Sequence, residues 1–396
     1  MRITEVQTFL MQAGAPPDTS WASDAKGHQT GSRNWLFVKI KTDAGLSGIG
    51  ECSGWPRVIE TAVQDFREHL IGEDPMAIER IWQKLYVAMM GHGMTGIVGS
   101  GALTGIDMAL WDIKGKALNT PVWNLLGGKL RDRVRIYTHA STAAVAKDVV
   151  KSGITAIKTG GIARPLDKVA ELRAAVGPDI DLMVDLHGPP WMTPAEAIRL
   201  GRALEPYGLL FIEDPVMPEL TDAYERIRDA VGVPLAAGER LGTIWGLRPL
   251  IERDLVAVVQ PDTGRAGGLT QMKKIAAMAE AHGITVAPHS GSLGPVAEFA
   301  AMHLMAAIPN ALMLERIEND WPGRQQVLTQ HLVLDQGHLI VPDRPGLGVD
   351  IDEDFVRSHP SIRNVAVAGG GYEPGTESET VYFQSRRGHA RVFRRE

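Results

Sequence analysis

Eight short apolar runs recur from residue 134 onward, and stretches of helical character separate them. In chain order the runs are Val134–Tyr137, Ile154–Lys158, Leu182–Asp185, Leu209–Glu213, Pro234–Glu239, Val256–Asp262, Ile284–His289 and Leu312–Glu315. Strands that alternate with helices predict parallel β/α units. Because eight such units close a barrel, the repeat predicts a (β/α)8-type architecture.

The residues before this repeat have a different pattern. About residues 1–60 contain strand-like runs joined by turn-rich segments, which predict a small antiparallel sheet. About residues 61–120 have helical periodicity, with Ile78, Ile81, Trp82 and Leu85 at the spacing of one helix face. We therefore expect a separate α+β domain in front of the barrel.

Size and charge exclude several classes of protein. The 396 residues are too many for one short module and enough to bury a large core. The net charge of −6 gives no support for binding a nucleic-acid backbone, and the single cysteine, Cys52, fits a reducing compartment. The N-terminus lacks secretory-signal features, and residues 85–106 are too polar and glycine-rich to span a membrane. We expect a cytoplasmic protein with no nucleic-acid or membrane partner.

Six successive runs end in a residue that can bind a metal or carry a proton. These residues are Asp185, Glu213, Glu239, Asp262, His289 and Glu315, spaced 23 to 28 residues apart. Because the carboxyl ends of barrel strands meet at one face, the six side chains should converge there. One acid after a strand is usually a helix cap or a solvated turn, but several buried carboxylates together require a cation. The oxygen-only set Asp185, Glu213 and Glu239 suits Mg²⁺.

The motifs around these residues are similar to those of the enolase superfamily. They are Ile-Glu-Asp-Pro at 212–215, Ala-Ala-Gly-Glu-Arg at 236–240, the segment 260–270, Ala-Pro-His at 287–289, and the flanking segments 106–116 and 345–351. The chain resembles the mandelate racemase branch over nearly its whole length short of the tail. Within that branch it is most similar to acid-sugar dehydratases of the galactonate dehydratase type.

This resemblance implies a particular fold and division of the chain. The expected fold class is α/β, a modified (β/α)7β TIM-like barrel with an α+β capping domain formed by the N-terminal region and a C-terminal segment. We expect residues 1–125 in the capping domain, 126–330 in the barrel and 331–365 in the return to the cap. Residues 366–396 are expected to be a disordered tail, because they are rich in glycine and arginine.

The resemblance also implies roles for the strand-end residues. Asp185, Glu213 and Glu239 would bind Mg²⁺, which binds the substrate carboxylate and stabilises an enediolate. His289, paired with Asp262, would be the general base for the proton α to that carboxylate. Such a proton is too weakly acidic for an unaided imidazole, so a preorganised cation must absorb the developing charge. The expected partners are a small-molecule sugar acid and further copies of the chain in a homo-oligomer.

Two features narrow the reaction. Racemases and several sugar-acid dehydratases of this branch carry Lys-x-Lys after the second strand, whereas this chain has Lys158-Thr159-Gly160, so the second base is missing and racemisation is not expected. His187 stands two residues after Asp185, on the same face of the strand, where the resemblance places a general acid. Together these features predict dehydration of an aldonate such as galactonate to a 2-keto-3-deoxy acid. The alternative for His187 is a hydrogen-bonded residue beside the metal site.

Other candidates have open alternatives. Lys158 binds the substrate carboxylate or is a surface lysine at a strand end. Glu315 hydrogen-bonds the substrate carboxylate or is a structural acid, and Arg240 is a candidate substrate contact. Weaker candidates for specificity are His139, Trp191, Glu318 and Trp321, and His92 is expected in a loop.

Several competing functions remain to be weighed. Residues 91–96 match the dinucleotide-binding G-x-G-x-x-G, but a helix rather than a strand is expected before them. The glycines of residues 264–268 suit a phosphate cradle or simply a tight turn. The remaining alternatives are another acid-sugar lyase, an epimerase or a cycloisomerase of the same branch, and a non-catalytic barrel protein. Loops at residues 15–34 and 51–57 would select the sugar.

Overall fold

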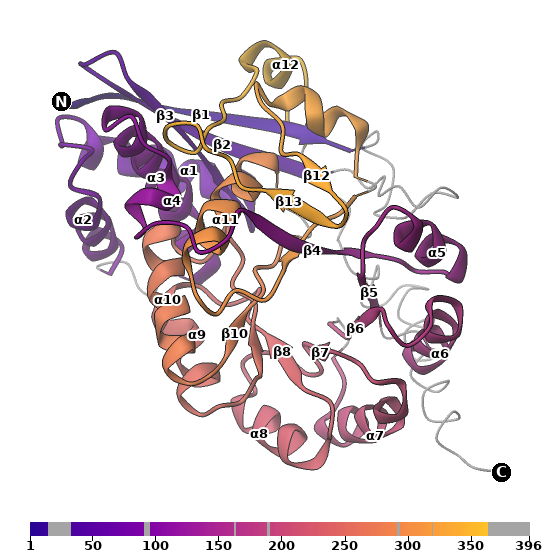
Figure 1. Ribbon diagram of the computed structural model, residues 1–396. Coiled ribbons are helices and arrows are strands. Elements are labelled where there is room, and N and C mark those ends of the chain that lie inside the picture. The colour runs from indigo at the N-terminus through magenta and orange to yellow at the C-terminus, as the bar shows by residue number, and fades with distance from the viewer. Residues whose placement is uncertain are drawn as a thin grey trace.

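A closed barrel of parallel strands forms the larger part of the molecule (Figure 1). The computed structural model describes residues 1–14, 33–90, 96–161, 164–187, 191–290, 294–318 and 320–362. The barrel strands are β4 (Arg133–His139), β5 (Ala156–Gly160), β6 (Asp181–Asp185), β7 (Phe211–Glu213), β8 (Leu235–Ala237), β9 (Val258–Val259), β10 (Thr285–Val286) and β11 (Leu314–Glu315). Neighbours pair in parallel from β4 to β10, β11 pairs with β4, and a Val286–Ala311 bridge completes the ring. The eight predicted strands are confirmed.

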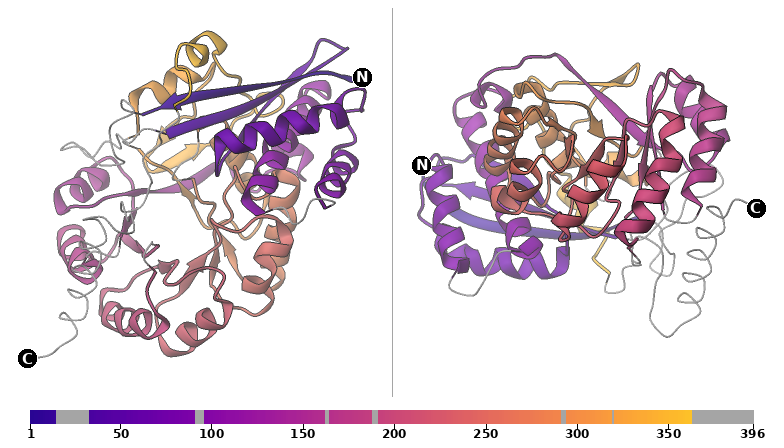
Figure 2. Two further views of the ribbon diagram at one scale, coloured as in Figure 1. Left: turned by 180° about the vertical axis from the view of Figure 1, so that it is seen from behind. Right: turned by 90° about the horizontal axis from the view of Figure 1, so that it is seen from below.

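One helix follows each of the first seven barrel strands and lies outside the ring (Figure 2). These helices are α5 (Ala143–Lys151), α6 (Pro165–Val176), α7 (Pro194–Leu204), α8 (Thr221–Ala230), α9 (Thr243–Glu252), α10 (Leu269–Ala281) and α11 (Pro295–Ala307). A short 3-10 helix, Glu205–Tyr207, extends α7, and another, Pro322–Val327, follows β11 in the described chain where an eighth α-helix would stand. The expected (β/α)7β barrel is therefore confirmed.

The N-terminal residues form the predicted sheet and helices at one side of the barrel (Figure 1). The antiparallel sheet consists of β1 (Ile3–Ala13), β2 (Arg33–Thr42) and β3 (Ser47–Cys52), and the helices are α1 (Pro56–Leu70), α2 (Ile78–Met90), α3 (Gly96–Ala117) and α4 (Val122–Leu125). Helix α3 lies directly on β3. Glycine at position 50 permits this contact, since a Cβ there would be 1.9 Å from the carbonyl oxygen of Gly105. We call these N-terminal elements the cap.

The chain after residue 330 touches both parts of the molecule. The hairpin of β12 (Leu334–Asp335) and β13 (His338–Ile340) adds to the barrel, since β13 pairs antiparallel with the first residues of β4. Helix α12 (Glu353–Arg357) packs beside the capping sheet, where Lys39 of β2 lies 2.7 Å from Glu353. No helix among the described residues is both long and apolar enough to cross a membrane.

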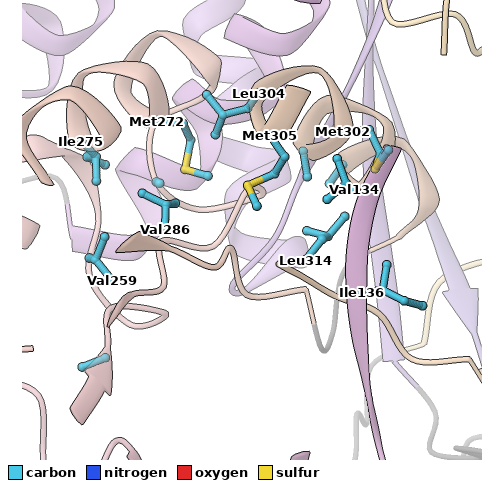
Figure 3. Packing of buried hydrophobic residues seen from close by; sticks show 14 of the residues in the cluster. Val134, Ile136, Val259, Met272, Ile275, Val286, Met302, Leu304, Met305 and Leu314 are labelled. Atoms are coloured by element: carbon cyan, nitrogen blue, oxygen red, sulfur yellow. The ribbon is translucent and has the colours of Figure 1, made fainter. Parts of the chain in front are cut away.

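Alternate residues of each barrel strand face opposite sides. One set faces outward and packs under the helices, as Figure 3 shows for Val134, Ile136, Val259, Val286 and Leu314, which meet Met272, Ile275, Met302, Leu304 and Met305 of α10 and α11. The other set fills the barrel interior with Tyr137, Ala156, Met183, Phe211, Ala236, Val258, Ala287 and Met313. The barrel is thus a packed core, and any site must lie at its ends.

Candidate active site

A layer of polar side chains lies directly above the apolar interior. Each is two residues beyond an interior residue on its strand, and alternate residues of a strand share a face. The layer contains Lys158, Asp185, Glu213, Gln260, His289 and Glu315, all at most 7% exposed. The layer contains four of the six strand-end residues that the sequence predicted to converge, and the other two, Glu239 and Asp262, contact its His289 at 2.7 and 2.6 Å.

The three proposed metal ligands end adjacent strands. Asp185 and Glu213 are direct partners in the parallel register of β6 and β7. Glu239 lies two residues after β8, beyond Gly238, whose φ is +138°. A Cβ at Gly238 would lie 3.0 Å from the backbone nitrogen of Gln260, so the turn that presents Glu239 requires glycine.

Basic side chains neutralise each of these carboxylates. Lys158 Nζ lies 2.7 Å from Glu213 Oε2 and 3.5 Å from Asp185 Oδ2. His187 Nδ1 lies 2.7 Å from Asp185 Oδ1. The third carboxylate, Glu239, has Arg240 at 2.8 Å from Oε1 and a histidine at its other oxygen. The layer is a network of alternating charges rather than a cluster of bare acids.

Burial and neighbouring charges set the protonation of this network. Burial and the charge of Asp185 raise the pKa of Glu213 to about 7. Although burial acts in the opposite direction, His187 and Lys158 hold the pKa of Asp185 at about 2. The charge of Asp185 raises the pKa of His187 to about 9. Burial disfavours the charged form of Lys158, but Glu213 and Glu315 keep its pKa well above the ordinary value.

His289 and Asp262 form a dyad on neighbouring strands. Asp262 Oδ2 lies 2.6 Å from His289 Nδ1, and Asp262 Oδ1 accepts a hydrogen bond from Gly264 N at 2.8 Å. The other ring nitrogen, His289 Nε2, faces the carboxylate layer 2.7 Å from Glu239 Oε2. A carboxylate on Nδ1 fixes the orientation of the imidazole and leaves Nε2 as the reactive nitrogen.

The donor set fits a divalent cation chemically. Three carboxylates on adjacent strands supply hard oxygen ligands, and the buried Glu213 Oε1 has no hydrogen-bond partner in the described structure. As the described side chains lie, no three His, Cys, Asp or Glu residues form a ready-made metal-binding group. In this arrangement each of the three carboxylates is paired with a basic side chain, Lys158, His187 or Arg240.

The sequence matches two family descriptions that cover both parts of the molecule. Residues 21–127 match the mandelate racemase / muconate lactonizing enzyme N-terminal domain, and residues 141–355 match the enolase C-terminal domain-like family. The chain belongs to the mandelate racemase branch of the enolase superfamily.

Several relatives of the chain carry functional names. D-galactonate dehydratase of Ralstonia nicotianae is 39% identical over 83% of this chain and 93% of its own length. D-galactonate dehydratase of Pectobacterium atrosepticum is 37% identical over 92% of this chain and 97% of its own length. These relatives are hydro-lyases by name, and the prediction of a carbon–oxygen lyase is confirmed at that level.

Solved structures of the superfamily share the fold. The 3,6-anhydro-D-galactonate cycloisomerase of Zobellia galactanivorans has a TM-score of 0.81 at 32% identity, covering 91% of this chain and 100% of its own. A mandelate racemase/muconate lactonizing enzyme-like protein from a Roseovarius species has a TM-score of 0.84 at 34% identity, covering 94% and 99%.

The remaining predicted residues lie at different depths in this superfamily site. Glu315 is fully buried and lies 2.7 Å from Lys158 Nζ and 2.6 Å from His139 Nε2. Arg240 is one-third exposed at the rim, with its guanidinium 5.3 Å from the ring centre of Trp191. Lys158 is only 1% exposed, so it is not a surface lysine.

Two weaker candidates have side-chain partners outside the polar layer. Trp321 packs against Trp35 of the capping sheet, at 6.0 Å between ring centres, and Glu318 forms an ion pair with Arg316. His92, residues 15–32 and the predicted tail from residue 366 lie outside the described residues.

Sequence reasoning missed two buried groups of the site. Gln260 donates to Glu213 Oε2 at 2.9 Å, and its place two residues before Asp262 was a signal that could have found it. Asp214 is fully buried beside the layer, with Tyr224 at 3.3 Å, and burial together with Glu239 raises its pKa well above the ordinary value. Nothing in the sequence distinguishes Asp214 from a helix-capping acid.

The structure also bears on the two glycine-rich alternatives. The segment before residues 91–96 is the helix α2, as expected, so the strand that a dinucleotide fingerprint requires is replaced by a helix. The amides of Gly264 and Gly267 donate to Asp262 Oδ1 and Thr104 Oγ1, so they already have protein acceptors. The tight-turn reading of residues 264–268 is therefore the better one.

Proposed function

We propose that this protein dehydrates a sugar acid, an aldonate such as galactonate, to a 2-keto-3-deoxy acid. The observation that carries the proposal is the placement of two histidines around one carboxylate layer: His289 with its Asp262 partner, and His187 beside Asp185. The names and identities of the relatives support the same reaction class. Asp185, Glu213 and Glu239 would hold Mg²⁺, which supplies Lewis-acid stabilisation of charge that develops on the substrate carboxylate.

The first step removes the proton from C2 of the substrate. His289 Nε2 accepts this proton, and the C2–H electron pair passes into the carboxylate system. Asp262 keeps Nδ1 of His289 protonated and stabilises the imidazolium that forms. A buried site favours the step, because fixed charges act more strongly where water is excluded.

The second step breaks the bond between C3 and its hydroxyl group. His187 donates a proton to the departing hydroxide, so water leaves and an enol remains, which then tautomerises to the 2-keto-3-deoxy acid. The imidazole of His187 is one-third exposed at the edge of the layer, where a leaving group can reach solvent. Lys158 and Glu315 are the proposed contacts of the substrate carboxylate, and Arg240 is proposed to bind the hydroxyl-bearing chain.

The strand that would carry a second base supports a one-base reaction. Gly160 faces Asp185 in the register of β5 and β6, and a Cβ there would have only ordinary contacts at 3.7 Å or more. A side chain would therefore fit, but this chain has none. The ammonium of Lys168 on α6 donates to the carbonyl oxygen of Gly160 at 3.0 Å, so Lys168 is the residue to examine if an epimerase were found.

The experiment is a panel of aldonic and aldaric acids incubated with Mg²⁺ and assayed for 2-keto acid. In deuterated water, the product should carry solvent deuterium at C3, and the recovered substrate should contain no C2 epimer. Lys168→Met should leave both results unchanged. A C2 epimer without keto acid would contradict the proposal and indicate an epimerase. An anhydro-sugar acid is tested beside the panel. Its conversion to an isomer without release of water would favour a cycloisomerase, the function named for one structural neighbour.

A further inference from the structure

Two buried carboxylates of the cap bind backbone amides at the starts of two consecutive barrel helices, α10 and α11. Glu51 of β3 accepts hydrogen bonds from Gly294 N and from Ala297 N, the latter at 2.9 Å, at the start of α11. Asp107 of α3 accepts a hydrogen bond from Thr270 N at 3.1 Å, at the start of α10. Both side chains are 1% exposed. An acid at a helix N-terminus meets free amide donors and the positive end of the helix dipole.

The two helices are those that follow the strands of the catalytic dyad. Asp262 stands seven residues before α10, which begins at Leu269, and His289 stands six residues before α11, which begins at Pro295. Each cap carboxylate therefore binds the start of a helix that begins six or seven residues after one member of the dyad.

Each carboxylate packs closely against a glycine at the start of its helix. A Cβ at Gly294 would lie 2.8 Å from Glu51 Oε1, and a Cβ at Gly268 would lie 2.3 Å from Asp107 Oδ2. Glycine at both helix starts thus lets the carboxylate approach the first amides directly.

Further contacts from the cap hold the loop after Asp262. Ser53 N donates to the carbonyl oxygen of Gly264 at 2.9 Å, and Gly267 N donates to Thr104 Oγ1 at 2.8 Å. Trp82 Nε1 donates to the carbonyl oxygen of Gly267 at 2.8 Å. The cap is therefore bonded along this loop and not only at its end.

We propose that Glu51 and Asp107 are positioning residues for proton abstraction, which hold the starts of α10 and α11 so that Asp262 and His289 keep their mutual geometry. The cap then contributes to the chemical step in addition to any role in enclosing the substrate. This inference rests on the proposed function only for the identity of the step that slows when the positioning is lost. Misplacing a reacting group by about 1 Å can lower a rate by about 10²-fold.

Glu51→Gln is the principal variant, because both oxygens of Glu51 accept from amides and a side-chain NH2 group would oppose one of them. Asp107→Ala removes the second positioning group. Asp112→Asn is the matched control: Asp112 is equally buried on α3. Its oxygens accept from Ile49 N, Leu347 N and Lys116 Nζ, and none of these groups lies at the start of α10 or α11. Gly294→Ala is a milder second variant, since φ of −75° accepts alanine and the nearest described atoms to the added Cβ belong to Glu51.

Two measurements decide the proposal. With C2-deuterated substrate, Glu51→Gln and Asp107→Ala should lower kcat by about 10- to 100-fold with little change in KM, and the primary isotope effect on kcat should rise. Without substrate, histidine-selective NMR should show the His289 imidazole proton that is shared with Asp262, assigned by its loss in His289→Asn. This signal should shift or broaden in Glu51→Gln, Asp107→Ala and Gly294→Ala and stay unchanged in Asp112→Asn.

The opposite results would overturn the inference. If Glu51→Gln and Asp112→Asn lower kcat equally, with the wild-type isotope effect and an unchanged His289 signal, the cap carboxylates are structural only. If the wild-type protein dehydrates no acid in the panel, the proposed function fails, and the NMR comparison still decides whether Glu51 and Asp107 position the dyad.

Discussion

Lys158 donates a hydrogen bond of 2.7 Å to Glu213 in the centre of the polar layer, and both side chains are only 1% exposed. The same ammonium lies 2.7 Å from Glu315 and 3.5 Å from Asp185. One buried cation therefore compensates three buried anions. Because an uncompensated buried charge is costly, Lys158 stabilises the folded protein in addition to its proposed contact with substrate.

Replacing Lys158 by methionine should destabilise the protein. Glu213 would then lose its ion-pair partner, and Asp185 and Glu315 would keep only their histidine partners. Breaking a buried pair in this way costs about 3–5 kcal/mol. Urea unfolding measures the loss, and Mg²⁺ should restore more stability to Lys158→Met than it adds to the wild type. Lys151→Met is the control, since its ion pair with Asp148 is about three-quarters exposed on both sides and contributes little. If Mg²⁺ raises the free energy of unfolding equally in Lys158→Met and in the wild type, the result contradicts a cation site beside Lys158.

Glu213→Gln should weaken metal binding without unfolding the barrel. Burial and the charge of Asp185 already raise the pKa of Glu213 to about 7, so a neutral side chain of the same shape is tolerated at this position. A chelator should abolish activity of the wild type and Mg²⁺ should restore it, whereas the Mg²⁺-dependent rise in Tm should be lost in Glu213→Gln. Full turnover by metal-free protein would contradict the proposal that the three carboxylates bind a catalytic Mg²⁺.

The converging strand ends could be read from the sequence because a barrel converts spacing into position. Residues that end consecutive strands at intervals of one β/α unit must share a face, whatever the loops do. Asp185, Glu213 and His289 illustrate this rule, since each is two residues beyond an apolar interior residue of its own strand. The predicted ring of strands depended on the same repeat.

The partners of these side chains could not be predicted in the same way. Nothing in the spacing indicated that Lys158 would bind three carboxylates, because that depends on side-chain reach across the ring. Glu51 meets Gly294 across 243 positions of sequence, and Asp107 meets Thr270 across 163. Such contacts follow from how the cap docks on the barrel, which leaves no periodic signal in the chain.

The two histidines should separate the two chemical steps. His289→Asn should lower both product formation and exchange of the C2 proton with solvent by about 10²- to 10⁴-fold, the range of general-base catalysis. Asp262→Asn should be impaired less, because the imidazole remains but loses its orienting partner. His187→Asn should retain C2 exchange and lose keto-acid formation. NMR in deuterated water measures exchange and product together, and loss of exchange in His187→Asn would show that His187 also acts in the first step.

Asp107 should make the stability of the protein fall as the pH rises. Burial raises the pKa of Asp107 to about 7 in the folded protein, compared with 3.8 for an ordinary aspartate. Between about pH 4 and pH 7 the folded protein therefore keeps a proton that the unfolded chain has lost. The free energy of unfolding contributed by this group should decline by at most about 1.4 kcal/mol per pH unit across that window and level off above it.

The measurement is urea unfolding at several pH values for the wild type and for Asp107→Asn. The asparagine cannot ionise, and its oxygen can still accept from Thr270 N, because only one oxygen of Asp107 accepts a backbone hydrogen bond there while the other has no partner among the described residues. The difference between the two curves isolates Asp107 from the other carboxylates, including Asp185, whose lowered pKa of about 2 makes its own contribution fall only in strong acid. Asp107→Asn should gain stability relative to the wild type as the pH rises from 4 to 7. Parallel curves would mean that Asp107 is ionised in the folded protein and that the helix dipole of α10 outweighs its burial.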